Sequence, residues 1–395
     1  MPIVTTLRAM CLAAAAALLA SGAAFAEAPP LKIGLLGGYS GAGALNGEEM
    51  DTAIKVWMQQ HGDTVAGRKI EIIRRDTTGP APDVVRREVQ ELISREKVDL
   101  ITGIEYTPNA LAAAGLSTQS KTPVLIVNAA TTAILAKAPY MSRFGFTTGQ
   151  VVAPLARWAI KNGITRVFAI YTDYGPGIEA GAVFKKTFTA SGGTILGEVK
   201  PPLASPDYSA YVQRAKDAKP QAIFIFAPAQ DHPPIFLKAF KDAGLADAGV
   251  KILATGDLSD EALLNALGDP AIGMITAYHY SEAHDSPLNH KFVKAFYAAA
   301  PKGLRPDFTA AVAYDAMHAI YAIVEKQGGK LDPDRTMALI KQLAFESPRG
   351  PIAIDQGRDI VQNVYIRRVA KVDGTLQNVE FATVPMVNDL GEPTK

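Results

Sequence analysis

The sequence is poor in cysteine, in net charge and in long hydrophobic runs. Its one cysteine, Cys11, lies in an apolar N-terminal segment, so the chain after that segment has no thiol and no disulfide. Its stability must therefore come from the size of its core. The apolar run from Ala9 to Ala20 is shorter than the roughly 20 residues that a membrane span needs, and no later run is long enough.

Basic and acidic residues nearly balance, with 40 Lys and Arg against 39 Asp and Glu. Arg8 is the only charged residue among the first 26, so the remainder carries 39 acids and as many bases. A balanced surface argues against nucleic acid or an anionic membrane as the main partner.

The N-terminus has the three parts of a secretory signal peptide. Arg8 supplies the positive charge, the Ala9 to Ala20 run supplies the apolar core, and Ala24-Phe25-Ala26 supplies an A-x-A cleavage site. We expect cleavage after Ala26 and a periplasmic mature protein. Arg8-Ala9-Met10 before Cys11 is a poor lipoprotein site, so no lipid anchor is expected.

Strand and helix signals alternate along most of the chain, which predicts an α/β protein with doubly wound parallel sheets. At 395 residues the chain exceeds the about 250 to 300 residues at which a single core stops growing, so two lobes are expected. Strands are predicted at 31–36, 69–75, 98–101, 124–127, 166–171, 194–199, 222–226, 250–254, 272–278, 352–355 and 361–369.

Helices replace the alternating pattern after residue 279, and strands return late. This order suggests three crossings between the lobes, near residues 146, 279 and 349. We assign 27–146 and 280–349 to an N-terminal lobe and 147–279 and 350–395 to a C-terminal lobe. A triple hinge of this kind would allow one lobe to close on the other.

Two neighbouring strands each end in a loop of small polar residues. After the first, Thr107 is interpreted as a helix N-cap and Pro108 as the first helical residue. After the second comes the loop 128–132, which contains Thr131. Parallel strands would bring both loops to the sheet edge where such folds bind ligands. Helix-terminal amides and threonine hydroxyls there predict a site for a small carboxylate.

Two further residues follow strand ends, and each has two interpretations. Tyr174 either faces the cleft or is a half-buried loop tyrosine. Asp257 either holds the ammonium group of a ligand or caps a helix that begins near Asp260. The Thr107 hydroxyl can both cap a helix and bind a ligand.

No segment of the sequence matches a catalytic or cofactor-binding motif well. The segment from Gly38 to Ala42 departs from G-x-S-x-G at its last residue, and the glycines from Gly41 to Gly47 miss the dinucleotide spacing. The histidines at 279 and 284 do not match a zinc motif. We expect neither an enzyme, a catalytic residue, a metal nor a cofactor.

The sequence resembles the periplasmic solute-binding proteins of branched-chain amino acid type ABC transporters, the leucine-binding-protein-like type I periplasmic binding proteins. The resemblance covers most of the mature chain. Its landmarks, in chain order, are Ile33-Gly34, the turn Ser40 to Gly47, Gly67 to Ile70 with Asp76, Val98-Asp99 with Gly103, Arg143-Phe144, Tyr174-Gly175-x-Gly177 and Ala313 to Ala316.

The resemblance implies which residues bind ligand. The carboxylate-binding hydroxyl of the family falls on Thr107, where serine is usual, and its backbone and hydroxyl pair falls on Ala129 and Thr131. The tyrosine from the second lobe falls on Tyr174. The ammonium-binding acid falls on Asp257, where glutamate is usual. An aromatic residue expected after the 222–226 strand is absent, since Ala227-Pro228-Ala229 stands there.

These departures bear on the ligand. The shorter Asp257 and the lost aromatic wall fit leucine less well, while the resemblance also includes binders of benzoates. An unpaired Asp257 would in turn disfavour an anionic ring ligand. We therefore place an aromatic acid slightly ahead of a branched-chain amino acid. The tyrosines expected near the cleft are Tyr39, Tyr106, Tyr174, Tyr278 and Tyr280, and Ser40 and Ala130 complete the candidate set.

The resemblance implies a membrane permease as partner, and we expect a monomer. A ligand-sensing receptor of the same fold, binding an amide or an amino acid, is the alternative, and a cleavable export signal argues against it.

Overall fold

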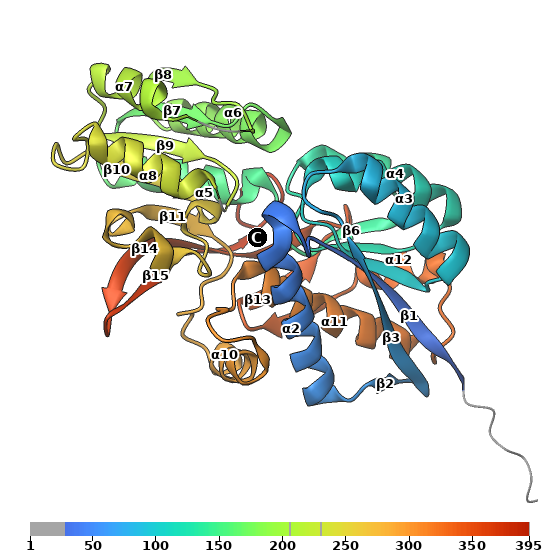
Figure 1. Cartoon of the computed structure of the whole chain (residues 1–395). Helices are drawn as coiled ribbons and strands as arrows, with labels where there is room; N and C mark the ends of the chain where they lie inside the picture. Colours follow the sequence, from blue (N-terminus) through green and yellow to red (C-terminus); the bar gives the residue numbers. More distant parts are fainter. Residues whose placement is uncertain (1–27, 205–206, 230, 395) are drawn as a thin grey trace, which may run out of the picture.

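The computed structural model describes residues 28–204, 207–229 and 231–394 and contains two β-sheets side by side (Figure 1). The predicted signal peptide lies outside the described residues. In the part of the chain that is described, no helix is both long and apolar enough to cross a membrane.

The first sheet has six strands, and all but the short β2 run parallel. Their order is β2 (Thr64–Val65), β3 (Arg68–Asp76), β1 (Ala28–Gly37), β4 (Leu100–Gly103), β5 (Val124–Ile126) and β6 (Met141–Arg143). Helices α3 (Pro82–Glu91) and α4 (Thr107–Ser120) cover one face. The other face packs on α2 (Ala44–His61) and on two helices from late in the chain, α11 (Phe308–Lys326) and α12 (Pro333–Ile340), while α10 (Pro287–Ala299) packs on α2 (Figure 1).

The second sheet has nine strands, parallel in its early part and antiparallel in its late part. The order is β12 (Ala344–Ser347), β13 (Gly350–Ile354), β14 (Ile360–Val372), β11 (Ile275–Tyr278), β10 (Lys251–Thr255), β9 (Ala222–Phe226), β7 (Arg166–Tyr171) and β8 (Thr194–Val199), with β15 (Thr375–Val387) paired to β14. Its helices include α5 (Thr148–Lys161), α6 (Gly175–Ala190), α7 (Ser209–Asp217), α8 (His232–Asp242) and the short α9 (Leu264–Leu267).

Strand β9 shows why the central strands are apolar throughout. Phe224 packs in the core that includes α5 and α6, whereas Ile223 and Ile225 pack on the opposite face with α7 and α8. Both faces of the sheet are covered by helices, so successive side chains on either face must be apolar. The predicted α/β fold with two doubly wound sheets is confirmed.

The chain passes between the two sheets three times. It leaves the first sheet after β6, leaves the second after β11, and returns to the second through β12. β12 begins at Ala344, so the chain re-enters the second sheet before the crossing predicted near residue 349. The division into two lobes stays a prediction.

Arg349, in the turn between β12 and β13, contacts the first two crossings and helix α11. Its side chain is fully buried, and it forms an ion pair of 2.7 Å with Asp315 of α11. One guanidinium nitrogen donates to the Phe144 carbonyl at 2.6 Å, and the other lies 3.3 Å from His279 Nδ1. Segments near residues 144, 279 and 349 therefore meet at one buried cation.

The predicted strand at 361–369 lies within β14, but β15, and with it the β14–β15 hairpin, was not predicted from the sequence. The two long strands of this hairpin are joined at Asp373-Gly374, where both residues have positive φ, +50° and +82°. Asp-Gly at such a position is a strong signal for a two-residue hairpin turn, and it stands in the sequence. Strands β6 and β12 were also missed, because each is only a few residues long.

Candidate functional site

A cavity lies where the carboxyl ends of the two sheets approach each other. In the first sheet, the strand order reverses direction between β1 and β4, and in the second between β7 and β9. Ligands of open α/β sheets bind outside the carboxyl ends of strands at such reversal points. Here the loops from both reversal points contribute to one cavity.

The cavity has an empty volume of about 560 Å³, including its open mouth. The residues of its lining are mostly strand-end and helix-start residues, namely Asn46, Glu105, Tyr106, Thr107, Asn128, Ala130, Phe146, Tyr174, Pro176, Phe226, Pro228, Ala229, Asp257, Asp260 and Phe308. Five predicted site residues are therefore in the described lining: Tyr106, Thr107, Ala130, Tyr174 and Asp257. No described lining residue is a lysine, arginine or histidine.

Thr107 and Thr131 lie together, as the sequence predicted. The Thr107 hydroxyl donates to the Thr131 hydroxyl at 3.1 Å, and of these two residues only Thr107 is in the described lining of the cavity. The prediction that Thr107 is an N-cap was wrong, because α4 begins at Thr107 and Tyr106 is its N-cap residue. The Thr107 side chain is thus turned toward the second loop instead of toward its own helix.

Ala129 does not offer its amide to a ligand, contrary to the prediction. Its N–H donates to the Glu105 carbonyl at 2.9 Å, and its side chain is buried in the core. Asn128 N–H likewise donates to the Ile104 carbonyl at 3.3 Å. These bonds join the two loops, and Ala129 and Ile104 both adopt positive φ, +36° and +65°. Such backbone is strained for residues other than glycine, and strain of this kind clusters at functional sites.

A buried cation stands behind the threonine pair. Arg143 donates to the Thr131 carbonyl at 3.0 Å and pairs with Asp359 at 2.9 Å. Burial lowers the pKa of Arg143 and raises the pKa of Asp359 to about 6, and each charge opposes the effect of burial on the other. Because Asp359 balances Arg143, this end of the cavity relies on hydroxyls and helix-terminal amides for an anion.

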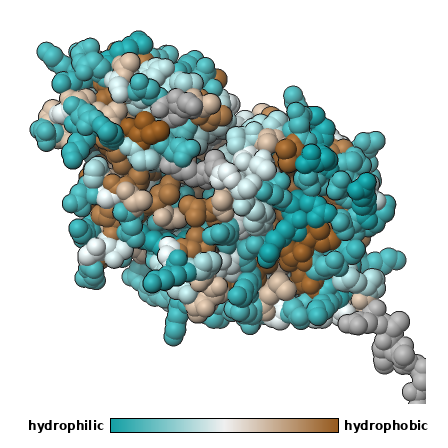
Figure 2. Space-filling view, in the orientation of Figure 1, coloured by the Kyte–Doolittle hydropathy of each residue, from teal (hydrophilic) through white to brown (hydrophobic). Residues whose placement is uncertain are grey.

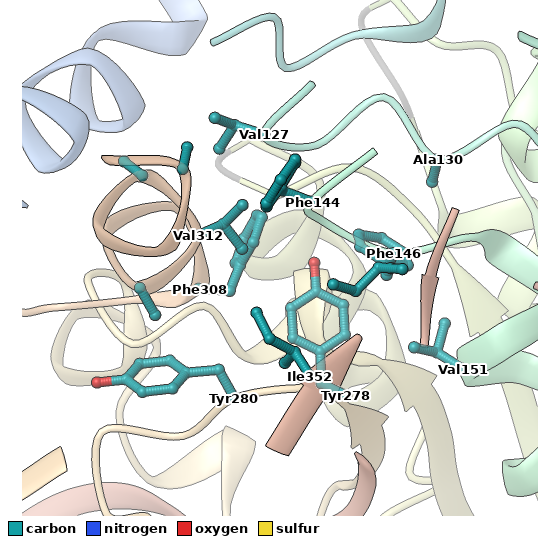
Figure 3. Packing of buried hydrophobic residues seen from close by; sticks show 14 of the residues in the cluster. Val127, Ala130, Phe144, Phe146, Val151, Tyr278, Tyr280, Phe308, Val312 and Ile352 are labelled. Atoms are coloured by element: carbon teal, nitrogen blue, oxygen red, sulfur yellow. The ribbon is translucent and has the colours of Figure 1, made fainter. Parts of the chain in front are cut away.

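Aromatic rings form much of the cavity wall. Tyr174 stands at the N-cap position of α6 with its ring centroid 6.4 Å from that of Phe226. Phe146 and Phe308 are 6.5 Å apart and perpendicular (Figure 3). Tyr174 therefore has both of its predicted properties, since it is half-buried and also lines the cavity. Flat walls of this kind suit a planar ligand.

Asp257 lies at the end of β10 and lines the cavity without capping a helix. It sits in a 3₁₀ turn, η4 (Gly256–Ser259), and no helix begins at Asp260. Its carboxyl group accepts from the Thr255 hydroxyl at 2.9 Å and from the Tyr278 hydroxyl at 3.3 Å. Burial raises the pKa of Asp257, and these two hydrogen bonds partly oppose that rise.

Tyr278 and Tyr280 were expected at the cleft, but both are in the core. The two phenol rings point in different directions (Figure 3). The Tyr278 hydroxyl reaches Asp257, so Tyr278 acts on the cavity through that residue. The Tyr280 hydroxyl donates to Asn289 at 3.1 Å, away from the cavity.

Tyr39 and Ser40 were expected at the cleft, but neither is among the described residues that line the cavity. The Tyr39 hydroxyl donates to Asp51 at 3.3 Å, and the Ser40 hydroxyl donates to Asp76 at 2.6 Å. The glycine-rich turn packs closely, with Gly47 N–H bonded to the Gly38 carbonyl at 3.0 Å. That packing turns both side chains toward polar partners outside the cavity.

Sequence reasoning missed two acids of the lining, Glu105 and Asp260. Glu105 accepts from Gly38 N–H at 2.6 Å, and its burial raises its pKa to about 7. Burial raises the pKa of Asp260 to about 6. Glu105 directly precedes Tyr106 at the end of β4, so its place after a strand was a usable signal.

Histidines do not form a metal site in the described part of the chain, where no group of three or more His, Cys, Asp or Glu residues could hold an ion. His284 instead lies 2.8 Å from Glu380, and His279 lies beside Arg349.

The chain matches the model of the family described as periplasmic binding protein over residues 30–375. It belongs to this family, in its leucine-binding-protein-like type. Leu/Ile/Val-binding protein homolog 6 of Brucella suis biovar 1 (strain 1330) is 39% identical over 375 residues, which cover 94% of this chain and 96% of the relative.

Two solved structures are also similar. A solute-binding protein of an ABC transporter from Rhodopseudomonas palustris BisB5, in complex with 3,4-dihydroxybenzoic acid, is 46% identical with a TM-score of 0.87, covering 91% of this chain and 98% of that chain. A counterpart from Rhodopseudomonas palustris HaA2, in complex with p-hydroxybenzoic acid, is 40% identical with a TM-score of 0.89, covering 92% and 99%. This periplasmic binding protein therefore has the substrate-binding role of an ABC transporter.

Proposed function

We propose that this periplasmic binding protein captures a hydroxylated aromatic carboxylate in the cavity between its two sheets and delivers it to the membrane permease of an ABC importer. The observation that carries the proposal is the Thr107 hydroxyl at the start of α4, which lines a cavity walled by aromatic rings and lies 3.1 Å from the Thr131 hydroxyl of the neighbouring loop. The carboxylate would lie at the hydroxyl pair and the ring between the aromatic walls.

Three features support an aromatic acid over an aliphatic one. The walls include Tyr106, Tyr174, Phe146, Phe226 and Phe308, and rings gain from stacking on rings. The carboxyls of Asp257 and Asp260 line the cavity and can accept a hydrogen bond from a ring hydroxyl. Finally, the two similar structures named above hold hydroxybenzoic acids.

A branched-chain amino acid is the second candidate, and Asp257 is the observation that favours it. A buried carboxylate in the cavity would pair well with the α-ammonium group of an amino acid. The name of the Brucella relative points the same way.

Calorimetry of the mature chain against single compounds tests the proposal. The panel contains benzoate, 4-hydroxybenzoate, 3,4-dihydroxybenzoate, leucine, isoleucine and valine. We expect binding of the hydroxybenzoates and none of the amino acids. A response to leucine alone would overturn the proposed ligand and leave the transport role in place.

The same proposal places the signal-peptide cleavage after Ala26 and the mature protein in the periplasm. N-terminal sequencing of the exported protein tests this, with Glu27 as the expected first residue.

A further inference from the structure

Four buried carboxyl groups lie at one end of the cavity. Asp257 and Asp260 line it. Glu49, in α2, and Asp307, the N-cap residue of α11, are close enough to Asp260 for its negative charge to raise the pKa of each. We call Glu49, Asp257, Asp260 and Asp307 the acid group. Each of the four is at most 9% exposed.

Two members of the acid group, Asp260 and Asp307, influence each other directly. The negative charge of Asp260 adds to the effect of burial in raising the pKa of Asp307. Asp307 also accepts from Glu261 N–H at 3.2 Å and from Phe308 N–H at 2.7 Å. Glu49 Oε2 is buried without a hydrogen-bond partner.

Two cations lie nearby: Arg305 is paired with acids outside the group, and the single charge of Arg367 lowers the pKa of both Asp257 and Asp307. Arg305 pairs with Glu261 at 3.2 Å and with Glu282 at 2.7 Å. Arg367 donates to the hydroxyls of Thr276 and Ser259 at 3.2 and 3.3 Å, and lies over the Tyr278 ring at 5.2 Å. Neither guanidinium lines the cavity, so the carboxyls at this end exceed the positive charge available to balance them.

A ligand carboxylate and a ring substituent therefore meet opposite environments. At the threonine pair a negative group finds hydroxyl and amide donors, whereas at the acid group a second negative group would face buried carboxyls. Like charges brought together in a water-poor site cost several kcal/mol. A neutral donor at the same place would instead find acceptors.

We propose that the acid group sets the charge specificity of the cavity, which admits a ligand with a single carboxylate and rejects a ligand that carries a second negative group at its other end. This inference rests on the proposed aromatic acid function. Asp260 and Asp257 act directly on the ligand substituent, and Asp307 and Glu49 act through Asp260.

The test compares two probes of nearly the same shape, terephthalate and 4-carbamoylbenzoate, which differ by one negative charge. Each is titrated by calorimetry into the mature protein near pH 8, with 4-hydroxybenzoate as the reference ligand. We expect 4-carbamoylbenzoate to bind about tenfold or more tightly than terephthalate, because of the like-charge cost.

Asp260→Asn removes one potential negative charge and leaves the side-chain volume almost constant. We expect it to reduce the ratio of the affinities for 4-carbamoylbenzoate and terephthalate. Asp247→Asn is the matched control, because Asp247 is exposed and outside the cavity lining, and its ratio should equal that of the unaltered protein. Asp257→Asn provides a second variant if Asp260→Asn does not fold, as judged by its melting temperature.

The outcomes separate the two proposals. Equal affinity for both probes, or an unchanged ratio in the folded Asp260→Asn or Asp257→Asn variant, would overturn the charge specificity. Binding of 4-hydroxybenzoate but neither larger probe would show that size is limiting and would also overturn it. If no aromatic acid binds, the proposed function fails, and this inference fails with it.

Discussion

At the scale of single residues, Thr107 carries the most specific expectation. Its hydroxyl is buried at the start of α4 and lies 3.1 Å from that of Thr131. Thr107→Val keeps the shape and removes one hydroxyl of the pair, so the pair can no longer turn a proton toward a carboxylate ligand, which should bind about 1 to 3 kcal/mol more weakly. Calorimetry with 4-hydroxybenzoate measures the change.

Thr118→Val on the same helix is the control, because its hydroxyl bonds to the Ala114 carbonyl at 2.8 Å and lies outside the lining. An affinity unaffected by Thr107→Val would remove Thr107 from the binding site.

The pH dependence of binding is a second expectation at this scale. Burial raises the pKa of Glu105 to about 7 and that of Asp260 to about 6, and a bound anion would raise both further. A raised pKa means that the neutral acid is favoured below it, so an anionic ligand should bind best at low pH and progressively less well as pH rises through about 6 to 7 and above.

The measurement is the affinity for 4-hydroxybenzoate across this range, with heats compared in buffers of different ionisation enthalpy to count protons taken up. The negative charge of Asp76 also raises the pKa of Glu105, and that of Glu261 also raises the pKa of Asp260. The positive charge of Arg367 lowers the pKa of Asp257. A constant affinity with no proton uptake would contradict the expectation.

The sequence predicted which residues lie at the sheet edge more reliably than it predicted the direction in which their side chains point. Thr107, Tyr174 and Asp257 follow strand ends and line the cavity, as predicted. Tyr39 also follows a strand end, but the turn that packs Gly47 against Gly38 directs its ring toward Asp51. Side-chain direction depends on such close contacts between distant residues, and residue spacing does not contain them.

At the scale of structural elements, the buried Arg349 predicts how two of the three crossings are stabilised. It pairs with Asp315 at 2.7 Å and holds the Phe144 carbonyl. Arg349→Leu would leave the Asp315 carboxyl buried without its cation, and removing one member of a buried pair costs about 3 to 5 kcal/mol. Urea unfolding should show this loss in the free energy of unfolding.

Arg214→Leu, at an exposed position of α7, gives the comparison, with a change near zero expected. If Arg349→Leu were equally harmless, the crossings would not depend on this ion pair.

Most elements could be predicted from the sequence, because apolar strands and amphipathic helices alternate with clear turn residues. Strands β7, β8 and β9 match their predicted ranges. Among the late strands, β13 overlaps its predicted range of 352–355, whereas β12 was missed because it has only four residues and is partly exposed. The Asp373-Gly374 turn was the available signal for β15.

At the scale of the whole molecule, one contact joins the elements around the first sheet to those around the second across the cavity rim. Glu179 of α6 accepts from the Thr132 hydroxyl at 2.6 Å and from Thr132 N–H at 3.3 Å. Thr132 begins η3 (Thr132–Lys137) after β5. A contact that exists only when the two parts meet favours the closed form.

Glu179→Ala should therefore weaken binding of 4-hydroxybenzoate, since part of the ligand energy would be spent on closure. We expect the ligand to reduce the radius of gyration in X-ray scattering, with a higher ligand concentration needed in the variant. Lys185→Ala on the same helix, with its exposed ion pair to Glu198, is the control. An identical response of Glu179→Ala and the control would contradict this role.

The two-sheet architecture was predictable because alternating strands and helices permit few other arrangements. The sequence did not predict that the two points of strand-order reversal face each other across one cavity, because this depends on how distant segments pack. Hydrophilic residues cover much of the visible surface, in keeping with the nearly balanced charge (Figure 2).

Segments from two crossings and helix α11 meet at Arg349, so that guanidinium would lie close to the axis of any opening. Atoms of a rotating body move in proportion to their distance from the axis, so Phe146, which follows the Phe144-Gly145 segment held by Arg349, would barely shift in any opening. Tyr106 and Tyr174 start from elements around different sheets and would separate more widely. Entry of a planar molecule would then begin between the two tyrosines and finish against a stationary phenylalanine.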